Sequence, residues 1–202
     1  MVEAKSFNDH IDKAISKASS MLGFIIRFSK EFDDPYTLKI LYTSYVRSHL
    51  EYASVIWNPY YENKSARIES IQKRFLIFAL RHHPRDVTIP RYILPPYNSR
   101  CALLNPDSLS NRRSIASAMF IYDLLTGRID SPDILMLLSI YVPTRRLRSR
   151  QFSIQQQYRR TNYGRSEPVF TTSCDFNSVV DIFDFCITRK GFRDSITIFF
   201  RN

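Results

Sequence analysis

Cationic residues between Thr144 and Ser166 give this sequence its strongest chemical signal. That stretch contains seven arginines and no acidic residue, and it also contains Phe152, Tyr158 and Tyr163. Guanidinium groups pair with phosphates, and aromatic rings offer faces on which bases stack. We therefore predict that the stretch contacts the backbone of RNA or DNA. The alternative is a solvated basic tail without a ligand.

A second set of cations accompanies a helical pattern between residues 64 and 83. Apolar residues recur there at every third or fourth position, and the cations Lys64, Arg67, Lys73, Arg74 and Arg81 fall outside that stripe. An ordinary solvated face is the alternative, because cations near a helix C-terminus also interact favourably with its dipole. From the two sets, the candidate nucleic-acid-binding residues are Lys73, Arg74, Arg81, Arg145, Arg146, Arg148, Arg150, Arg159, Arg160 and Arg165.

Residue patterns typical of catalysis or metal binding are missing from the sequence. Asp33 and Asp34 are adjacent acids, but a proline follows at once, so we interpret Asp34 as a helix N-cap rather than a metal ligand. His82 and His83 lie near Cys101 in the chain without the ligand spacing of a zinc site. Only 4 glycines are present, too few for a phosphate-cradling loop. We expect no catalytic residue, no metal site and no cofactor.

Composition limits the class of protein. The 202 residues are 44% hydrophobic, enough for a packed core, and their net charge of +10 favours a polyanionic partner. The 3 cysteines are few and odd in number, which indicates a reducing intracellular location, cytoplasmic or nuclear. The longest strongly apolar run, from Ile134 to Val142, is too short to span a membrane, and no secretory leader opens the chain. We expect a soluble protein without a membrane partner.

Periodicity predicts a mainly α-helical fold. Residues 1–83 are expected to form a compact three-helix unit, with helices over residues 7–28, 35–57 and 64–83. Asp34 should cap the second helix, and the histidine-proline pair at residues 83–84 should end the third. Residues 84–109 are rich in proline and are predicted to be a connecting loop.

The second half of the chain divides into three further segments. A second helical unit is expected over residues 110–142, with Ser110 as its N-cap, Gly127 as the stop of its first helix and a short helix after Ser131. Residues 143–176 are predicted to be an extended basic arm, since no periodicity there supplies a core. Asn177 should cap a last amphipathic segment over residues 177–202.

An ordered run of motifs resembles a known family. In the first half these are LGFIIR (22–27), LYTSYVRSHLEYASVIWNP (41–59) and RIESIQKRF (67–75). In the second half they are DLL (123–125), RIDSP (128–132), YVP (141–143), LR (147–148) and RTNYG (160–164). Together they cover nearly the whole chain and are similar to the region downstream of the catalytic palm in non-LTR retrotransposon reverse transcriptases of the jockey type.

The resemblance implies a thumb and its C-terminal extension, a helical unit that grips the template-primer duplex while the palm performs synthesis. The family's polymerase signature, Tyr or Phe-x-Asp-Asp on a hairpin, has no match here, and Asp33-Asp34 is not that signature. RNA-directed DNA polymerase activity and its Mg²⁺ would belong to the palm, which we expect the chain to lack. The expected function is non-catalytic contact with RNA or DNA by a truncated or degenerate copy of a mobile element. A reverse transcriptase palm domain is the second expected partner.

A helical protein-interaction or self-associating module, with no nucleic-acid role, is the alternative. Helix faces that pack on a palm in the parent family would be exposed in an isolated thumb, and exposed apolar surface favours association. An isolated enzyme is not expected.

Overall fold

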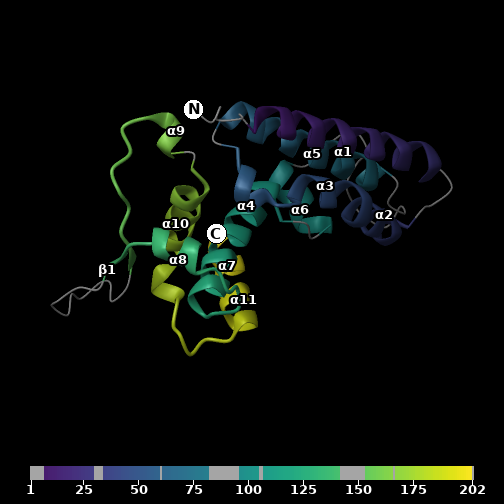
Figure 1. Cartoon of the computed structure of the whole chain (residues 1–202). Helices are drawn as coiled ribbons and strands as arrows, with labels where there is room; N and C mark the ends of the chain where they lie inside the picture. Colours follow the sequence, from purple (N-terminus) through teal and green to yellow (C-terminus); the bar gives the residue numbers. More distant parts are fainter. Residues whose placement is uncertain are drawn as a thin grey trace. The chain divides into compact units, whose positions relative to one another are not determined.

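The protein is mainly α-helical, as its periodicity predicts. The computed structural model describes residues 7–29, 34–59, 61–81, 96–104, 107–141, 153–165 and 167–201. The chain divides into two compact units, Met1–Ser110 and Asn111–Asn202. Figure 1 shows both units, coloured along the sequence from purple to yellow.

Two long helices, α1 (Asn8–Phe28) and α5 (Glu62–Arg81), lie side by side in the first unit (Figure 1). Each has apolar residues at every third or fourth position, so one stripe of each helix can be buried. These two predicted helices are confirmed. Their buried apolar residues are Ile11, Ala18, Leu22 and Ile25 from α1, and Ile68, Ile71, Phe75, Leu76 and Ala79 from α5.

Asp34 begins the next helix, α2 (Pro35–Leu41), as its sequence predicts. Its carboxylate accepts hydrogen bonds from the backbone N–H groups of Tyr36 at 3.1 Å and Thr37 at 2.9 Å. These donors have no partner within the helix, so the carboxylate satisfies them, and its negative charge also faces the positive end of the helix dipole. A capping role accounts for Asp34 without any metal.

Beyond α2 the chain is not the continuous helix that was predicted over residues 35–57. A π-helical segment, η2 (Tyr42–Arg47), leads into α3 (Ser48–Glu51). Ala53 then takes a left-handed conformation with a φ of 52°, which separates α3 from α4 (Ser54–Trp57). The indole N–H of Trp57 donates to the carbonyl five residues earlier at 2.7 Å. The spacing of apolar residues does not predict this break in the helix, because the residue with the left-handed conformation is exposed.

A buried amide joins η2, α5 and two later segments. The Gln72 side chain is fully buried and accepts a hydrogen bond from the Tyr42 hydroxyl at 3.0 Å. Its amide N–H₂ donates to the Tyr97 hydroxyl at 2.9 Å and to the Asp107 carbonyl at 3.0 Å. The Tyr42 ring also stacks on Phe75, with centroids 4.0 Å apart. The side-chain oxygen and both N–H groups of this amide therefore have hydrogen-bond partners.

The loop predicted over residues 84–109 contains a helix, α6 (Tyr97–Leu104), so that prediction is wrong for this segment. The Tyr97 hydroxyl donates to a carboxylate oxygen of Glu69, and the same oxygen accepts the Leu109 backbone N–H at 3.1 Å. Prolines immediately before residue 97 indicated a break, but proline is also well tolerated where a helix begins. Contacts with Glu69 and Gln72 then fix the helix on α5.

Helix α7 (Leu109–Leu125) crosses the boundary between the units: its first two residues belong to the first unit and the rest to the second. Ser110 lies inside this helix, so its prediction as the N-cap is wrong. Gly127 ends the helix as predicted: its φ is 69°, a conformation that glycine adopts without the steric cost of a Cβ. The short helix α8 (Pro132–Leu137) follows, also as predicted.

The predicted extended arm over residues 143–176 is only partly extended. Residues 142–152 lie outside the described residues, and β2 (Ser153–Ile154) pairs antiparallel with β1 (Ile140–Tyr141). After an irregular stretch the chain forms α9 (Asn162–Arg165) and then α10 (Pro168–Ser178), so the extended prediction is wrong for both segments.

Asn177 lies within α10 and is not the helix N-cap that was predicted. Its side-chain oxygen accepts the backbone N–H of Ile154 at 3.0 Å, and its amide donates to the Ile154 carbonyl at 2.8 Å. One side chain therefore makes the two backbone hydrogen bonds that a further strand would make with β2, and it holds β2 against α10. An asparagine before an apolar run has the same sequence pattern in either role.

The C-terminal segment folds into a 3₁₀ turn, η3 (Val180–Ile182), and α11 (Arg189–Arg201). The prediction of an amphipathic end is confirmed, since α11 buries Phe192 and Ile196. Arg189 holds α11 to α7 through a bidentate pair with Asp123, at 2.8 and 2.9 Å. Asp123 is only 8% exposed, whereas the Arg189 side chain is 47% exposed, so the pair joins a buried carboxylate to a guanidinium at the surface.

Asp175 on α10 is a poorly solvated carboxyl group in the same unit. Burial raises its pKa to about 6, although hydroxyls of Ser117 and Ser114 and the charge of Arg113 act in the opposite direction. The folded state therefore favours the protonated acid. Its contribution to stability is complete below the unfolded pKa of 3.8 and is lost as the pH rises through about 6.

Replacing Gln72 with Leu should destabilise the first unit by about 2–4 kcal/mol, because one buried and two partly buried partners lose their hydrogen bonds while apolar burial is kept. Tyr42→Phe removes only one of these bonds and should cost about 1–2 kcal/mol. The chain contains 1 tryptophan, Trp57, which is buried in this unit, so urea unfolding followed by its fluorescence reports the change. Equal stability of Gln72→Leu and wild type would contradict this role.

Asp175→Asn should stabilise the second unit at pH 7.5 by about 2 kcal/mol, because the amide removes the cost of ionising a buried acid. The difference should disappear between pH 6 and pH 4, where the native aspartate becomes protonated. Urea unfolding followed by far-UV circular dichroism measures both values, with the exposed Asp181→Asn as the matched control. A loss of stability at pH 7.5 would mean that attraction to Arg113 outweighs burial.

Candidate nucleic-acid interface

The three cations predicted on α5 do not share one face. Arg74 and Arg81 are seven residues apart, two helical turns, and therefore lie on one stripe with Arg67. Lys73 is rotated from Arg74 by about 100° around the helix axis. All three predicted residues are exposed. Only Arg74 and Arg81 could contact the same segment of a polyanion along this helix.

Lys73 faces α6 instead. Its ammonium lies 5.2 Å from the centroid of the Tyr97 ring, and the guanidinium of Arg100 lies 6.0 Å from the same ring. Burial and the neighbouring Glu69 carboxylate raise the pKa of the Tyr97 phenol, so the hydroxyl stays protonated and donates to Glu69. Lys73 is exposed but already has a cation–π partner, which gives it a structural role beside any contact with phosphate.

Lys64 and Arg67, the other cations of the predicted α5 face, share one carboxylate of α1. Lys64 Nζ lies 2.8 Å from one oxygen of Asp12, and Arg67 Nη1 lies 2.6 Å from the other. Hydrogen bonding from Lys64, with the charges of both cations, lowers the pKa of the Asp12 carboxyl, which stays ionised. The carboxylate offsets one of the two positive charges, so this half of the face is less basic than its cations alone suggest.

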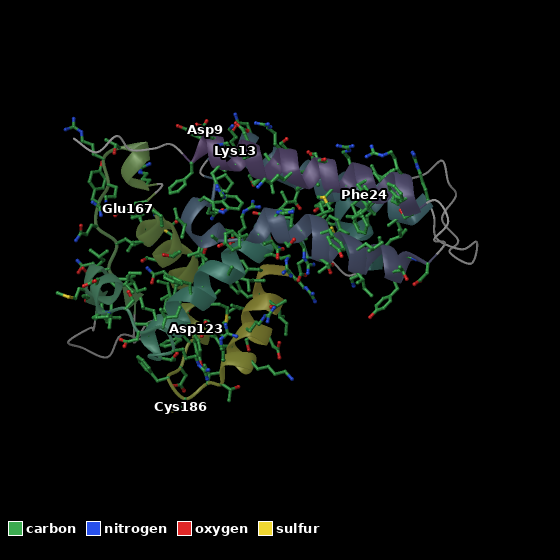
Figure 2. The ribbon with its side chains drawn as sticks, turned by 45° about the vertical axis from the view of Figure 1, so that its right-hand side comes forward. Asp9, Lys13, Phe24, Asp123, Glu167 and Cys186 are labelled. Carbon is green, nitrogen blue, oxygen red and sulfur yellow. The ribbon has the colours of Figure 1, made fainter. Side chains whose placement is uncertain are left out.

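The described arginines of the stretch lie at a turn, residues 159–165, where the irregular segment after β2 leads into α9. The Arg159 side chain packs across Gly164, where an added Cβ would lie 3.3 Å from the Arg159 Cβ. Its Nη2 is 3.1 Å from a carboxylate oxygen of Glu167, the residue labelled near α10 in Figure 2. Arg165 Nε donates to the Arg159 carbonyl at 3.3 Å. Glu167, the first acidic residue after the stretch from Thr144 to Ser166, therefore neutralises one of its arginines.

This turn and the residue before it present three side chains to solvent. Tyr158 is 86% exposed, and Arg160 and Arg165 are both exposed. A base can stack on the exposed ring, and guanidinium groups a few residues along the chain can pair with phosphates. The structure thus brings Arg159, Arg160 and Arg165 together but leaves Arg159 half-buried. The predictions for Arg145, Arg146, Arg148 and Arg150 lie outside the described residues.

Sequence reasoning missed further cations in the first unit. Lys13, Lys17 and Arg27 are exposed on α1, and Arg100 lies beside Tyr97. The available signal was the lack of acidic residues in α1 after Asp12, which a count of cations alone does not weigh. A positive surface depends on where the acids are as much as on where the bases are.

Within the parts of the chain that the structure describes, no three His, Cys, Asp or Glu side chains gather as a metal site would require. None of the helices described is long and apolar enough to cross a membrane. The chain matches no protein-family model, no curated protein and no solved structure. The functional interpretation therefore depends on the residues of this chain.

Arg160→Gln should weaken binding of a single-stranded oligonucleotide more than Arg159→Gln. Arg160 is exposed, whereas Arg159 is already paired with Glu167. Loss of one phosphate contact should reduce the slope of log K against log salt by about 0.7 for Arg160→Gln, with a smaller change for Arg159→Gln. Fluorescence anisotropy titrations at several NaCl concentrations measure both slopes. If both variants lost the same affinity and slope, Arg159 would contact the oligonucleotide in spite of its ion pair with Glu167.

Proposed function

We propose that the chain contacts RNA or DNA without catalysing a reaction. The observation that carries this proposal is the exposure of Tyr158, Arg160 and Arg165 within one short segment of the chain. A ring and two cations in one short segment supply stacking and phosphate pairing together. The net charge of +10 favours approach of a polyanion over a longer range.

The non-LTR retrotransposon reverse transcriptases are the parent family that we propose. The ordered motifs along the sequence support this origin, and a mainly helical chain is compatible with a thumb and its extension. Two motif residues, Trp57 and Asp123, are buried and hydrogen-bonded, as expected of positions that maintain a fold. In such a protein the chain would grip the template-primer duplex. Synthesis and its Mg²⁺ would belong to a palm domain, which is the second proposed partner.

A protein-interaction or self-associating module is the second candidate function. Its specific support is a group of exposed apolar side chains on α8 and β1: Met136 is 82% exposed, Leu137 63%, Ile140 44% and Tyr141 48%. Large exposed apolar side chains that gather on neighbouring elements are typical of association surfaces.

The intact protein should bind a labelled oligonucleotide with a strong salt dependence. If four arginines each neutralise one phosphate, log K should fall against log salt with a slope of about −3 to −4. Anisotropy titrations with RNA, DNA and hybrid duplexes measure this slope and the preference among the three ligands. Replacing Arg145, Arg146, Arg148 and Arg150 together with Gln should remove most of this salt dependence.

A slope near zero would contradict the proposed function. Concentration-dependent sedimentation without oligonucleotide binding would favour the association module instead. Primer extension assays with the purified chain should give no product, because its proposed role is contact and not synthesis.

A further inference from the structure

The outer face of α1 carries cations and aromatic rings together. Lys13, Lys17, Phe24, Arg27 and Phe28 are all exposed. Figure 2 labels Lys13 and Phe24, which come from opposite halves of this helix. From residue 13 to residue 29 the chain contains no acidic residue. We call these five residues the α1 outer face.

Helical spacing aligns these side chains. With 3.6 residues per turn, Lys13, Lys17, Phe24 and Phe28 fall within about 60° of one another around the axis, on an exposed side of the helix about 120° from the centre of the buried stripe. The distance along the helix from residue 13 to residue 28 is about 22 Å, at 1.5 Å per residue. The face is therefore a narrow strip with two ammonium groups at one end and two rings at the other.

The two rings form an exposed pair. Phe24 is 47% exposed and Phe28 64% exposed, and their centroids are 4.3 Å apart with an interplanar angle of 31°. Each phenyl group would bury much more area in a core, so its exposure is unfavourable without a ligand. This close, tilted pair of rings still leaves exposed aromatic surface to which a further flat group can bind.

The surrounding charge favours a polyanion over a protein partner. Lysine is depleted at the centre of protein–protein interfaces, whereas cations around aromatic rings are typical of surfaces that bind nucleic acid strands. Asp12, which is partly exposed, is already paired with Lys64 and Arg67. Asp9 lies one turn before Lys13 on the same side of α1, at the end of the strip farthest from the rings (Figure 2), and no acidic residue follows Asp12 in this helix.

Resting on the proposed nucleic-acid contact, we propose that the α1 outer face binds unpaired nucleotides. Phe24 and Phe28 stack on bases, while Lys13, Lys17 and Arg27 pair with the phosphates. Bases within a duplex have both faces covered by their neighbours, so exposed rings select single-stranded segments. This surface is separate in sequence from the arginine stretch.

The double variant Phe24→Leu/Phe28→Leu tests the proposal, because it keeps apolar side chains and removes the rings. We expect it to bind a fluorescein-labelled 15-mer of deoxythymidine about 10- to 100-fold more weakly than wild type. An abasic 15-mer with the same phosphates should bind wild type and variant equally. Trp57 fluorescence during urea unfolding checks that the variant is folded, and the exposed Tyr52→Leu is the matched control.

Lys13→Gln/Lys17→Gln should reduce the salt slope for the same 15-mer by about 1.4, at about 0.7 per phosphate. If wild type binds the 15-mer and the leucine variant binds it equally well, the stacking role is overturned while the proposed function stands. If wild type binds no oligonucleotide, both fail together. If the variants instead lose binding only to phosphatidylserine vesicles or only self-association, the α1 outer face serves another partner and the proposal is overturned.

Discussion

Gln72 is an amide without solvent exposure, and such a group is compatible with a folded state only where its polar atoms find partners. Its partners come from η2, α6 and the segment that enters α7, so one side chain sets how these elements lie on α5. The π-helical turn has a role in this arrangement, since it places the Tyr42 hydroxyl within 3.0 Å of the amide while its ring stacks on Phe75. Consequently the rotation of α5 is fixed, and with it the cations that face solvent.

The fixed rotation of α5 divides its cations by their partners. Lys64 and Arg67 meet Asp12, and Lys73 lies over Tyr97, whereas Arg74 and Arg81 face outward. In the second unit the same division occurs over a few residues, where Arg159 pairs with Glu167 and Arg160 is exposed. The net charge of +10 is therefore larger than the charge available to a ligand at either surface.

Two surfaces combine rings with cations, one on each unit. The segment that contains Tyr158 has guanidinium groups, which pair with phosphate through two hydrogen bonds, while the α1 outer face has mainly ammonium groups, which act as point charges. Tyr158 lies in an irregular segment, whereas the rings of the α1 outer face lie on a helix and are positioned before a ligand arrives. Less conformational entropy is then lost on binding than for a disordered basic tail.

Local spacing and backbone preference suffice to predict the helices with strong apolar periodicity, the Asp34 cap and the Gly127 stop, and the cation-rich stretches are evident from composition. The break at Ala53 involves one exposed residue, to which the spacing of apolar residues is blind. The helix α6, the pairing of β1 with β2 and the role of Asn177 depend on partners distant in the sequence, so they emerge only from the folded chain. The same reason applies to charge: whether an arginine is available depends on an acid such as Asp12 or Glu167, and folding determines which cations those acids meet.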